Sequence, residues 1–263
     1  MSAMTTPIEL AAASLRRVYQ DRTPIPPLRE AIGANDPTTA YAIQEANTTH
    51  WLAAGRRLVG RKIGATSKAV QTMLGLDQPD YGMLFADMAY SDGEPVPTAL
   101  LCQPKVEGEI AFYLSDDLDS DRMTIADVVH AIEYAVAAIE IVDSRIAGWN
   151  IKILDTIADN ASAGLYVLGT QPRRLNEFNP LLCGMVMEMR GEPVATGAGI
   201  ACYGNPLTAT LWLARKMVEV GRPLKKGDTI LSGSLGPLVP VAPGDSIELR
   251  INGLGTVRSH FSA

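Results

Sequence analysis

One short segment constrains the fold more than any other, because residues 135–142 are apolar throughout except for Glu140. The segment is far too short to cross a membrane as a helix, which needs about 20 residues. Its β-branched residues instead predict a buried strand over residues 137–142. An ionised carboxylate in the middle of such a strand is costly unless it is paired or metal-bound. We therefore expect Glu140 to have a charged partner.

A second strand, predicted over residues 106–114, contains two further acidic residues, Glu107 and Glu109. Because side chains alternate along a strand, both carboxylates lie on one face, about 7 Å apart. Gly108 between them leaves the opposite face bare, so that another element can pack closely there or the strand can bend. The alternative, a solvated strand face, stays open at this point.

Three carboxylates in a chain with few histidines favour a hard cation. The chain has only three histidines, which excludes an H-E-x-x-H metalloprotease and a His-rich zinc site. Mg²⁺ and Mn²⁺ prefer oxygen ligands and keep several waters, so they match this donor set. The alternative is a structural salt bridge from Glu140 to Arg145 or Lys105.

The composition excludes several classes of protein. Of the 263 residues, 47% are hydrophobic and 20% are charged, which is typical of a globular chain. Twenty-nine acidic residues against 23 basic ones, without a basic run, argue against a nucleic-acid partner. The three scattered cysteines, Cys102, Cys183 and Cys202, are expected to be buried thiols. The N-terminal residues lack the features of a secretory signal, so we expect a cytoplasmic protein that does not span a membrane.

The sequence pattern predicts a helical N-terminal layer, residues 1–56, and a β-rich core, residues 57–263. We expect the two to form a single α+β domain. Helical spacing predicts one helix beginning at Ile8 and another after Asp36, its N-cap. A hairpin over residues 185–194 and a helix that begins at Asn205-Pro206 follow in the core.

Local sequence patterns predict the structure of four further segments of the core. Thr66 is expected to cap a short helix, and a capping box at Thr124 is expected to begin a helix that runs through Ala135. Residues 78–82 are expected to form a turn. Residues 155–162 are expected to be a polar loop, of the kind that often holds active-site groups.

Two more polar residues are candidates for chemistry. Lys62 lies in the segment 60–67, which ends a strand and begins a helix, so that Lys62 and nearby amides can receive an anion. Asp80 can act as a base. The ordinary alternatives are a solvated lysine at the end of a strand and an aspartate that only forms a turn.

Six segments together resemble the 2-keto-4-pentenoate hydratase branch of the fumarylacetoacetate hydrolase superfamily. The resemblance covers nearly the whole chain, and the order and spacing of the segments make it specific. The segments are residues 60–64, 67–82, 107–112, 142–146, 158–162 and 231–235.

The resemblance implies a mixed, rolled β-sheet core with flanking helices. It implies a metal-dependent addition of water to 2-hydroxypenta-2,4-dienoate in the catabolism of aromatic compounds, with Mg²⁺ or Mn²⁺ as cofactor. It also implies a homo-oligomer and leaves open a complex with a decarboxylase of the same pathway. The implied site consists of the metal ligands Glu107, Glu109 and Glu140, with Lys62 and Asp80 beside the substrate. Asp80 is our candidate for proton transfer and Lys62 for its charge partner, and Ser162 and Ser234 are further candidates for hydrogen bonds to the substrate.

The same superfamily supplies alternatives. The 4-oxalocrotonate decarboxylases share the carboxylate triad, but the position of Asp80 looks apolar in their pattern. Residues 149–153 follow the hydratase pattern except at Asn150, where a lysine is usual. Hydrolases that cleave carbon–carbon bonds use a histidine from a lid, whereas the N-terminal layer offers only His50, in mid-helix. A non-catalytic partner subunit is the remaining alternative, and the intact site residues argue against it.

Overall fold

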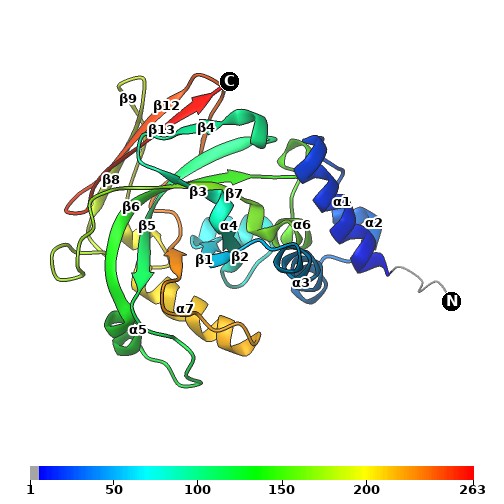
Figure 1. Cartoon of the computed structure of the whole chain (residues 1–263), viewed down its shortest axis with the longest axis horizontal. Coiled ribbons are helices and arrows are strands. Elements are labelled where there is room, and N and C mark those ends of the chain that lie inside the picture. Colours follow the sequence, from blue (N-terminus) through cyan, green and yellow to red (C-terminus); the bar gives the residue numbers. More distant parts are fainter. Residues whose placement is uncertain (1–5) are drawn as a thin grey trace.

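Two curved β-sheets form the body of the molecule, and the N-terminal helices lie at one end of it (Figure 1). The computed structural model describes residues 6–263, so residues 1–5 of the predicted helical layer lie outside the described residues. No helix within residues 6–263 is long and apolar enough to cross a membrane. The predicted α+β class with a mixed sheet core is confirmed.

The larger sheet has eight strands in the order β2-β1-β10-β5-β6-β7-β3, with β11 beside β5. Strand β10 runs parallel to β1 and antiparallel to β5, so it joins two parts of the chain that are distant in sequence. The strands are β1 (Leu58–Gly64), β2 (Asp80–Phe85), β3 (Ala89–Ser91), β5 (Pro104–Leu114), β6 (Ile132–Asp143), β7 (Ala163–Leu168), β10 (Thr229–Leu231) and β11 (Val239–Pro240).

The smaller sheet has five strands in the order β4-β13-β12-β8-β9. A Cβ on Gly108 of β5 would lie 2.5 Å from Met185 Sδ and 2.6 Å from Leu249 Cδ1, both in this sheet. The predicted close approach at the bare face of Gly108 is therefore confirmed. The strands are β4 (Pro95–Pro97), β8 (Gly184–Met189), β9 (Glu192–Ala198), β12 (Ser246–Ile251) and β13 (Gly255–Ser262).

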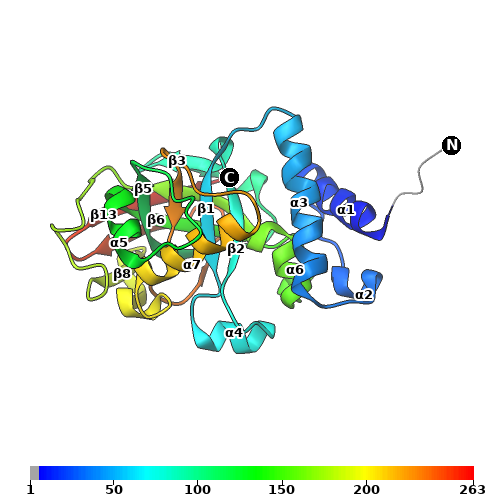
Figure 2. The same ribbon diagram turned by 90° about the horizontal axis from the view of Figure 1, so that it is seen from below.

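The N-terminal helices pack with a helix from the middle of the chain. Apolar side chains such as Leu15, Ile43 and Ile157 form a core of their own between α1 (Pro7–Asp21), α2 (Leu28–Ile32), α3 (Pro37–Ala53) and α6 (Ile153–Ala158). In Figure 2, α4 (Lys68–Leu74) stands out from the body. Two further helices, α5 (Ile125–Ala131) and α7 (Pro206–Glu219), contact each other.

The structure corrects two local predictions near β1. Ser67 rather than Thr66 caps α4, since the Ser67 hydroxyl accepts a hydrogen bond from Val70 N. Of the predicted turn at residues 78–82, residues 80–82 belong instead to β2, because residues 80–85 pair with β1. Asp80 is therefore fixed at the start of a strand.

Two further predictions fail where tertiary contacts override local pattern. The helix that begins after Thr124 ends at Ala131, and Ile132, Tyr134 and Ala135 already pair with β5 as part of β6. Residues 155–158 belong to α6 rather than to a loop, since Leu154 and Ile157 of that helix are buried in the helical layer.

Candidate active site

The antiparallel pairing of β5 and β6 brings three carboxylates together. Glu107 lies directly opposite Glu140, and Glu109 shares the face of Glu107 two residues further along β5. One carboxylate oxygen from each of the three lies within 4.8 Å of the other two. Glu107 is 9% exposed, Glu109 0% and Glu140 1%, so the pair on β5 is not a solvated strand face.

Few hydrogen-bond donors reach these carboxylates. Glu109 Oε2 accepts a hydrogen bond from Gly233 N at 2.8 Å, but Glu109 Oε1 and both oxygens of Glu140 accept none. Lys62 Nζ lies 3.0 Å from Glu140 Oε1, an ion pair without hydrogen-bond geometry. One lysine does not compensate three buried carboxylates, so this set of oxygen donors fits a divalent cation.

Without a cation, the surroundings of Glu107 and Glu109 disfavour the ionised form of both acids. Burial raises the pKa of Glu107 to about 7, with a further rise from Glu140, while Lys62 and the Ser234 hydroxyl oppose the shift. Burial also raises the pKa of Glu109 well above its usual range, and Glu140 and Glu107 add to the rise. A bound cation would reverse this preference and keep Glu107 and Glu109 ionised.

Strands β1 and β2 bring Lys62 and Asp80 together beside the cluster. Gly64 lies opposite Asp80 in the register, and a Cβ there would collide with Asp80 Oδ1 and lie 3.3 Å from Lys62 Nζ. Asp80 is buried, and its Oδ1 accepts no hydrogen bond. Burial raises the pKa of Asp80, although the charge of Lys62 opposes the rise. Burial lowers the pKa of Lys62, but Glu140, Asp80 and the other carboxylates outweigh it and the net shift is upward.

A cavity of about 450 Å³ joins these groups to the two predicted serines. Lys62, Asp80 and Glu107 line it together with Ser162 and Ser234. Apolar side chains from α4 and from two loops form another part of the wall, namely Val70, Met73, Leu74, Ile151 and Leu238. The cavity therefore offers charged groups for a small anion and an apolar surface for its hydrocarbon part.

The two serines are held by different local structures. Ser162 ends a left-handed turn in which Asn160, Ala161 and Ser162 have φ values of 56°, 52° and 53°. Its Oγ lies 3.5 Å from Thr156 Oγ1. Ser234 follows β10, and its hydroxyl donates to the carbonyl of Gly236.

Comparison with known proteins identifies the family. Residues 44–262 match the family model described as Fumarylacetoacetate (FAA) hydrolase C-terminal. The chain belongs to the fumarylacetoacetate hydrolase family. It is 57% identical, over 99% of its length and 97% of the relative, to a Pseudomonas putida protein named TodF product hydratase. It is 55% identical, over 97% of both chains, to 2-keto-4-pentenoate hydratase 1 of Dechloromonas aromatica.

A solved structure with the same fumarylacetoacetate hydrolase fold is that of 4-oxalocrotonate decarboxylase from Pseudomonas putida G7, complexed with magnesium and adipate. This chain superposes on it with a TM-score of 0.94 and 31% sequence identity, over 99% of each chain. The fold of the larger and smaller sheets is thus shared with a protein whose name describes a decarboxylase, whereas the relatives by sequence are named hydratases.

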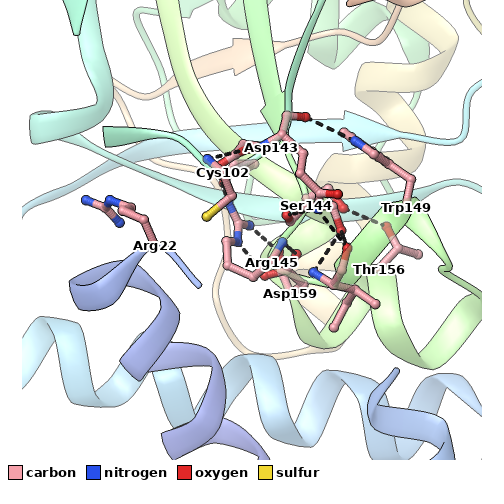
Figure 3. Close-up of polar contacts among 12 residues, drawn as sticks. Arg22, Cys102, Asp143, Ser144, Arg145, Trp149, Thr156 and Asp159 are labelled. Carbon is pink, nitrogen blue, oxygen red and sulfur yellow. Dashed lines mark hydrogen bonds and ion pairs between the residues drawn. The ribbon is translucent and has the colours of Figure 1, made fainter. Parts of the chain in front are cut away.

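Neither Arg145 nor Lys105 pairs with Glu140; each contacts a different residue. The alternative of a structural salt bridge from Glu140 to one of them is therefore wrong. Arg145 Nε donates to Asp159 Oδ1 at 2.6 Å (Figure 3). Lys105 Nζ lies 4.1 Å from the centre of the Trp149 ring, and both residues line the cavity. Sequence reasoning assigned neither of them to the site, although Lys105 has the same alternation along β5 as Glu107 and Glu109.

Proposed function

We propose that this chain is a divalent-metal-dependent hydratase that adds water to 2-hydroxypenta-2,4-dienoate and forms 4-hydroxy-2-oxopentanoate. The observation that carries the proposal is a cavity lined by Lys62, Asp80 and Glu107, because Glu107 also belongs to the buried cluster of three carboxylates. Relatives named 2-keto-4-pentenoate hydratase, which are 52% to 55% identical over 97% of the chain, support the same reaction in the catabolism of aromatic compounds.

Glu107, Glu109 and Glu140 are the proposed ligands of the cation. A divalent cation supplies Lewis acidity toward the carboxylate and the 2-oxygen of the substrate when it is bound. We propose Mg²⁺ or Mn²⁺, because all three donors are carboxylate oxygens. The magnesium in the related decarboxylase structure supports this choice.

Asp80 and Lys62 are the proposed catalytic groups. The substrate first loses the proton of its 2-hydroxyl group and gains one at C5, which gives a conjugated 2-oxo-3-enoate. Water then adds its hydroxyl group to C4 and a proton to C3. The raised pKa of Asp80 lets its carboxyl group retain a proton at higher pH than an ordinary aspartate, which suits a group that gives and takes protons. Lys62 remains cationic and is placed to hold a substrate oxygen.

Ser162 and Ser234 are proposed to hydrogen bond to the substrate, while the apolar wall faces its hydrocarbon end. A relative named 2-hydroxyhexa-2,4-dienoate hydratase, from Comamonas testosteroni, is 47% identical over 80% of this chain and 80% of its own. This relative supports an apolar wall that also accepts a dienoate one carbon longer.

Decarboxylation of 4-oxalocrotonate is the second candidate function, because the superposed decarboxylase shares the whole fold. The buried acid at Asp80 favours hydration, since adding water needs a proton-transfer group beside the substrate. A non-catalytic partner subunit is disfavoured by the complete set of polar groups in the cavity.

We also propose that residues 1–263 form one catalytic domain and that copies of this chain assemble into a homo-oligomer. A complex with a decarboxylase of the same pathway remains part of the proposal. Exposed apolar side chains such as Leu10 on α1 and Leu182 support an interface. The three cysteines are free thiols, which supports a cytoplasmic location. Sedimentation at the mass of one chain would contradict the assembly.

Product analysis tests the proposed function. The purified chain is incubated with Mn²⁺ and either 2-hydroxypenta-2,4-dienoate or 4-oxalocrotonate, and the products are identified by NMR together with released carbon dioxide. We expect 4-hydroxy-2-oxopentanoate from the first substrate and little carbon dioxide from the second. Faster release of carbon dioxide would make the chain a decarboxylase, and no turnover of either substrate would make it a silent subunit.

A further inference from the structure

Arg145 and Asp159 form an ion pair (Figure 3). Asp159 directly precedes the turn of residues 160–162, which carries Ser162. Arg145 lies two residues after the end of β6 and is 2% exposed. Its Nε donates to Asp159 Oδ1 at 2.6 Å, and its backbone N donates to Asp159 Oδ2 at 2.9 Å. Its two terminal nitrogens donate to the carbonyls of Asp159 at 2.8 Å and Ala163 at 2.9 Å. One guanidinium group therefore holds both ends of residues 159–163.

The turn of residues 160–162, which Arg145 and Asp159 hold, is conformationally strained. Asn160, Ala161 and Ser162 are three consecutive residues in the left-handed region, and none of them is glycine. Glycine adopts this region readily, whereas a residue with a Cβ is disfavoured there. Such a turn persists only where its surroundings hold it, and strain of this kind is concentrated at functional sites.

The middle of the turn attaches to the strand beside Lys62. Asn160 Oδ1 accepts from Met83 N at 2.7 Å, and Asn160 Nδ2 donates to Met83 O at 2.9 Å, so the side chain extends the edge of β2. A Cβ on Gly82 would collide with the carbonyl of Asn160 and would lie 3.2 Å from Lys62 Cγ. The turn is thus in close contact with the part of the sheet that holds the proposed catalytic lysine.

The last residue of the turn faces the cavity. Ser162 N donates to the carbonyl of Asp159 at 3.0 Å, and Ser162 lines the cavity together with Ala161 and Thr156. The carbonyl of Asp159 that accepts the hydrogen bond from Ser162 N also accepts one from the Arg145 guanidinium group. A displacement of Asp159 therefore moves Ser162, although neither Asp159 nor Arg145 lines the cavity themselves.

We propose that Asp159, held by Arg145, is a positioning residue that fixes the hydroxyl group of Ser162 in the substrate cavity. The inference rests on the proposed function, in which Ser162 binds the substrate. It assigns a role in the reaction to two residues that do not touch the substrate.

A double-mutant cycle tests the positioning role. Asp159→Asn keeps the size of the side chain but removes its charge, and Ser162→Ala removes the hydroxyl group that it is proposed to position. We expect each single variant to lower kcat by about tenfold or more, while the affinity for Mn²⁺ changes less than about twofold. In the Ser162→Ala background, Asp159→Asn should lower kcat by less than about a further twofold, because the positioned group is already missing.

Control variants separate positioning from general destabilisation. Asp245→Asn alters another buried aspartate, which accepts from Ala242 N and pairs with Arg190, and it should leave kcat unchanged. Arg145→Lys, alone and combined with Ser162→Ala, replaces Asp159→Asn in the cycle if that variant does not fold, because it removes hydrogen bonds from the guanidinium group to the turn. Losses that multiply in the double variant, or wild-type kcat in either single variant, would overturn the positioning role. Absence of wild-type turnover would instead refute the proposed function.

Discussion

At the scale of single residues, Asp80 is where the choice of reaction can be tested. Its carboxyl group is buried, lacks a hydrogen bond at Oδ1 and lies beside Lys62. Asp80→Asn preserves size but removes proton transfer, and we expect kcat to fall by about 10²–10⁴-fold. The affinity for Mn²⁺ should not change. The control Asp77→Asn alters an exposed aspartate three residues earlier and should leave kcat unchanged. Full activity of the Asp80 variant would reduce this residue to a structural role.

Glu109 should behave in the opposite way. Glu109→Gln removes a negative charge from the proposed ligand set, so the dissociation constant for Mn²⁺ should rise by at least about tenfold. The metal-free variant should still fold, because glutamine resembles the protonated acid that burial favours at this position. Isothermal titration with Glu133→Gln, an exposed residue of β6, as control would measure the difference. An unchanged affinity would remove Glu109 from the ligand set.

The sequence identifies these residues to different degrees. Glu107 and Glu109 follow from the alternation of a strand, and Glu140 follows from its apolar neighbours. The roles of Lys62 and Asp80 are predicted only through the family resemblance. The pairing of β1 with β2 brings the two residues together, but the local sequence at the start of β2 predicts a turn. The role of Arg145 had no local signal, since its partner Asp159 follows 14 residues later.

At the scale of secondary-structure elements, the fit of β5 against the smaller sheet depends on Gly108. Gly108→Ala places a methyl group against Met185 and Leu249, and such overpacking typically costs about 1–3 kcal/mol. Urea unfolding should show this loss, whereas Gly184→Ala, with open space around its Cβ position, should show less. Equal stability of the two variants would mean that the sheets adjust freely at this contact.

Elements with strong local signals are predicted well, and those decided by distant partners are not. The helices after Thr6 and Asp36 have side-chain caps and match the structure. Residues 132–135 continue a helical spacing in sequence, yet eleven residues of β5 from Pro104 to Leu114 pair with β6 and draw them into the sheet. The position of β10 between β1 and β5 has no local signal, because its partners lie more than 100 residues away.

At the scale of the whole molecule, the buried acids make stability depend on pH. The pKa of Glu107 is about 7 in the folded chain against an ordinary value of 4.5, so the folded state binds more protons between these values. Stability of the metal-free protein should therefore fall as pH rises from about 4.5 to about 7. Saturating Mn²⁺ should remove this fall, because the cation stabilises the ionised cluster. Urea unfolding at pH 5 and pH 7.5, with chelator or with Mn²⁺, would measure it, and a metal-free protein more stable at pH 7.5 would contradict it.

The central claim is that the cluster of Glu107, Glu109 and Glu140 holds a divalent cation on which hydration depends. The direct measurement is the loss of ultraviolet absorbance of 2-hydroxypenta-2,4-dienoate, first after exhaustive chelation and then during titration with Mn²⁺. We expect almost no turnover by the chelated protein and full recovery at one cation per chain, with no such recovery in Glu109→Gln at the same concentration. Full turnover by the chelated, metal-free protein would contradict the claim.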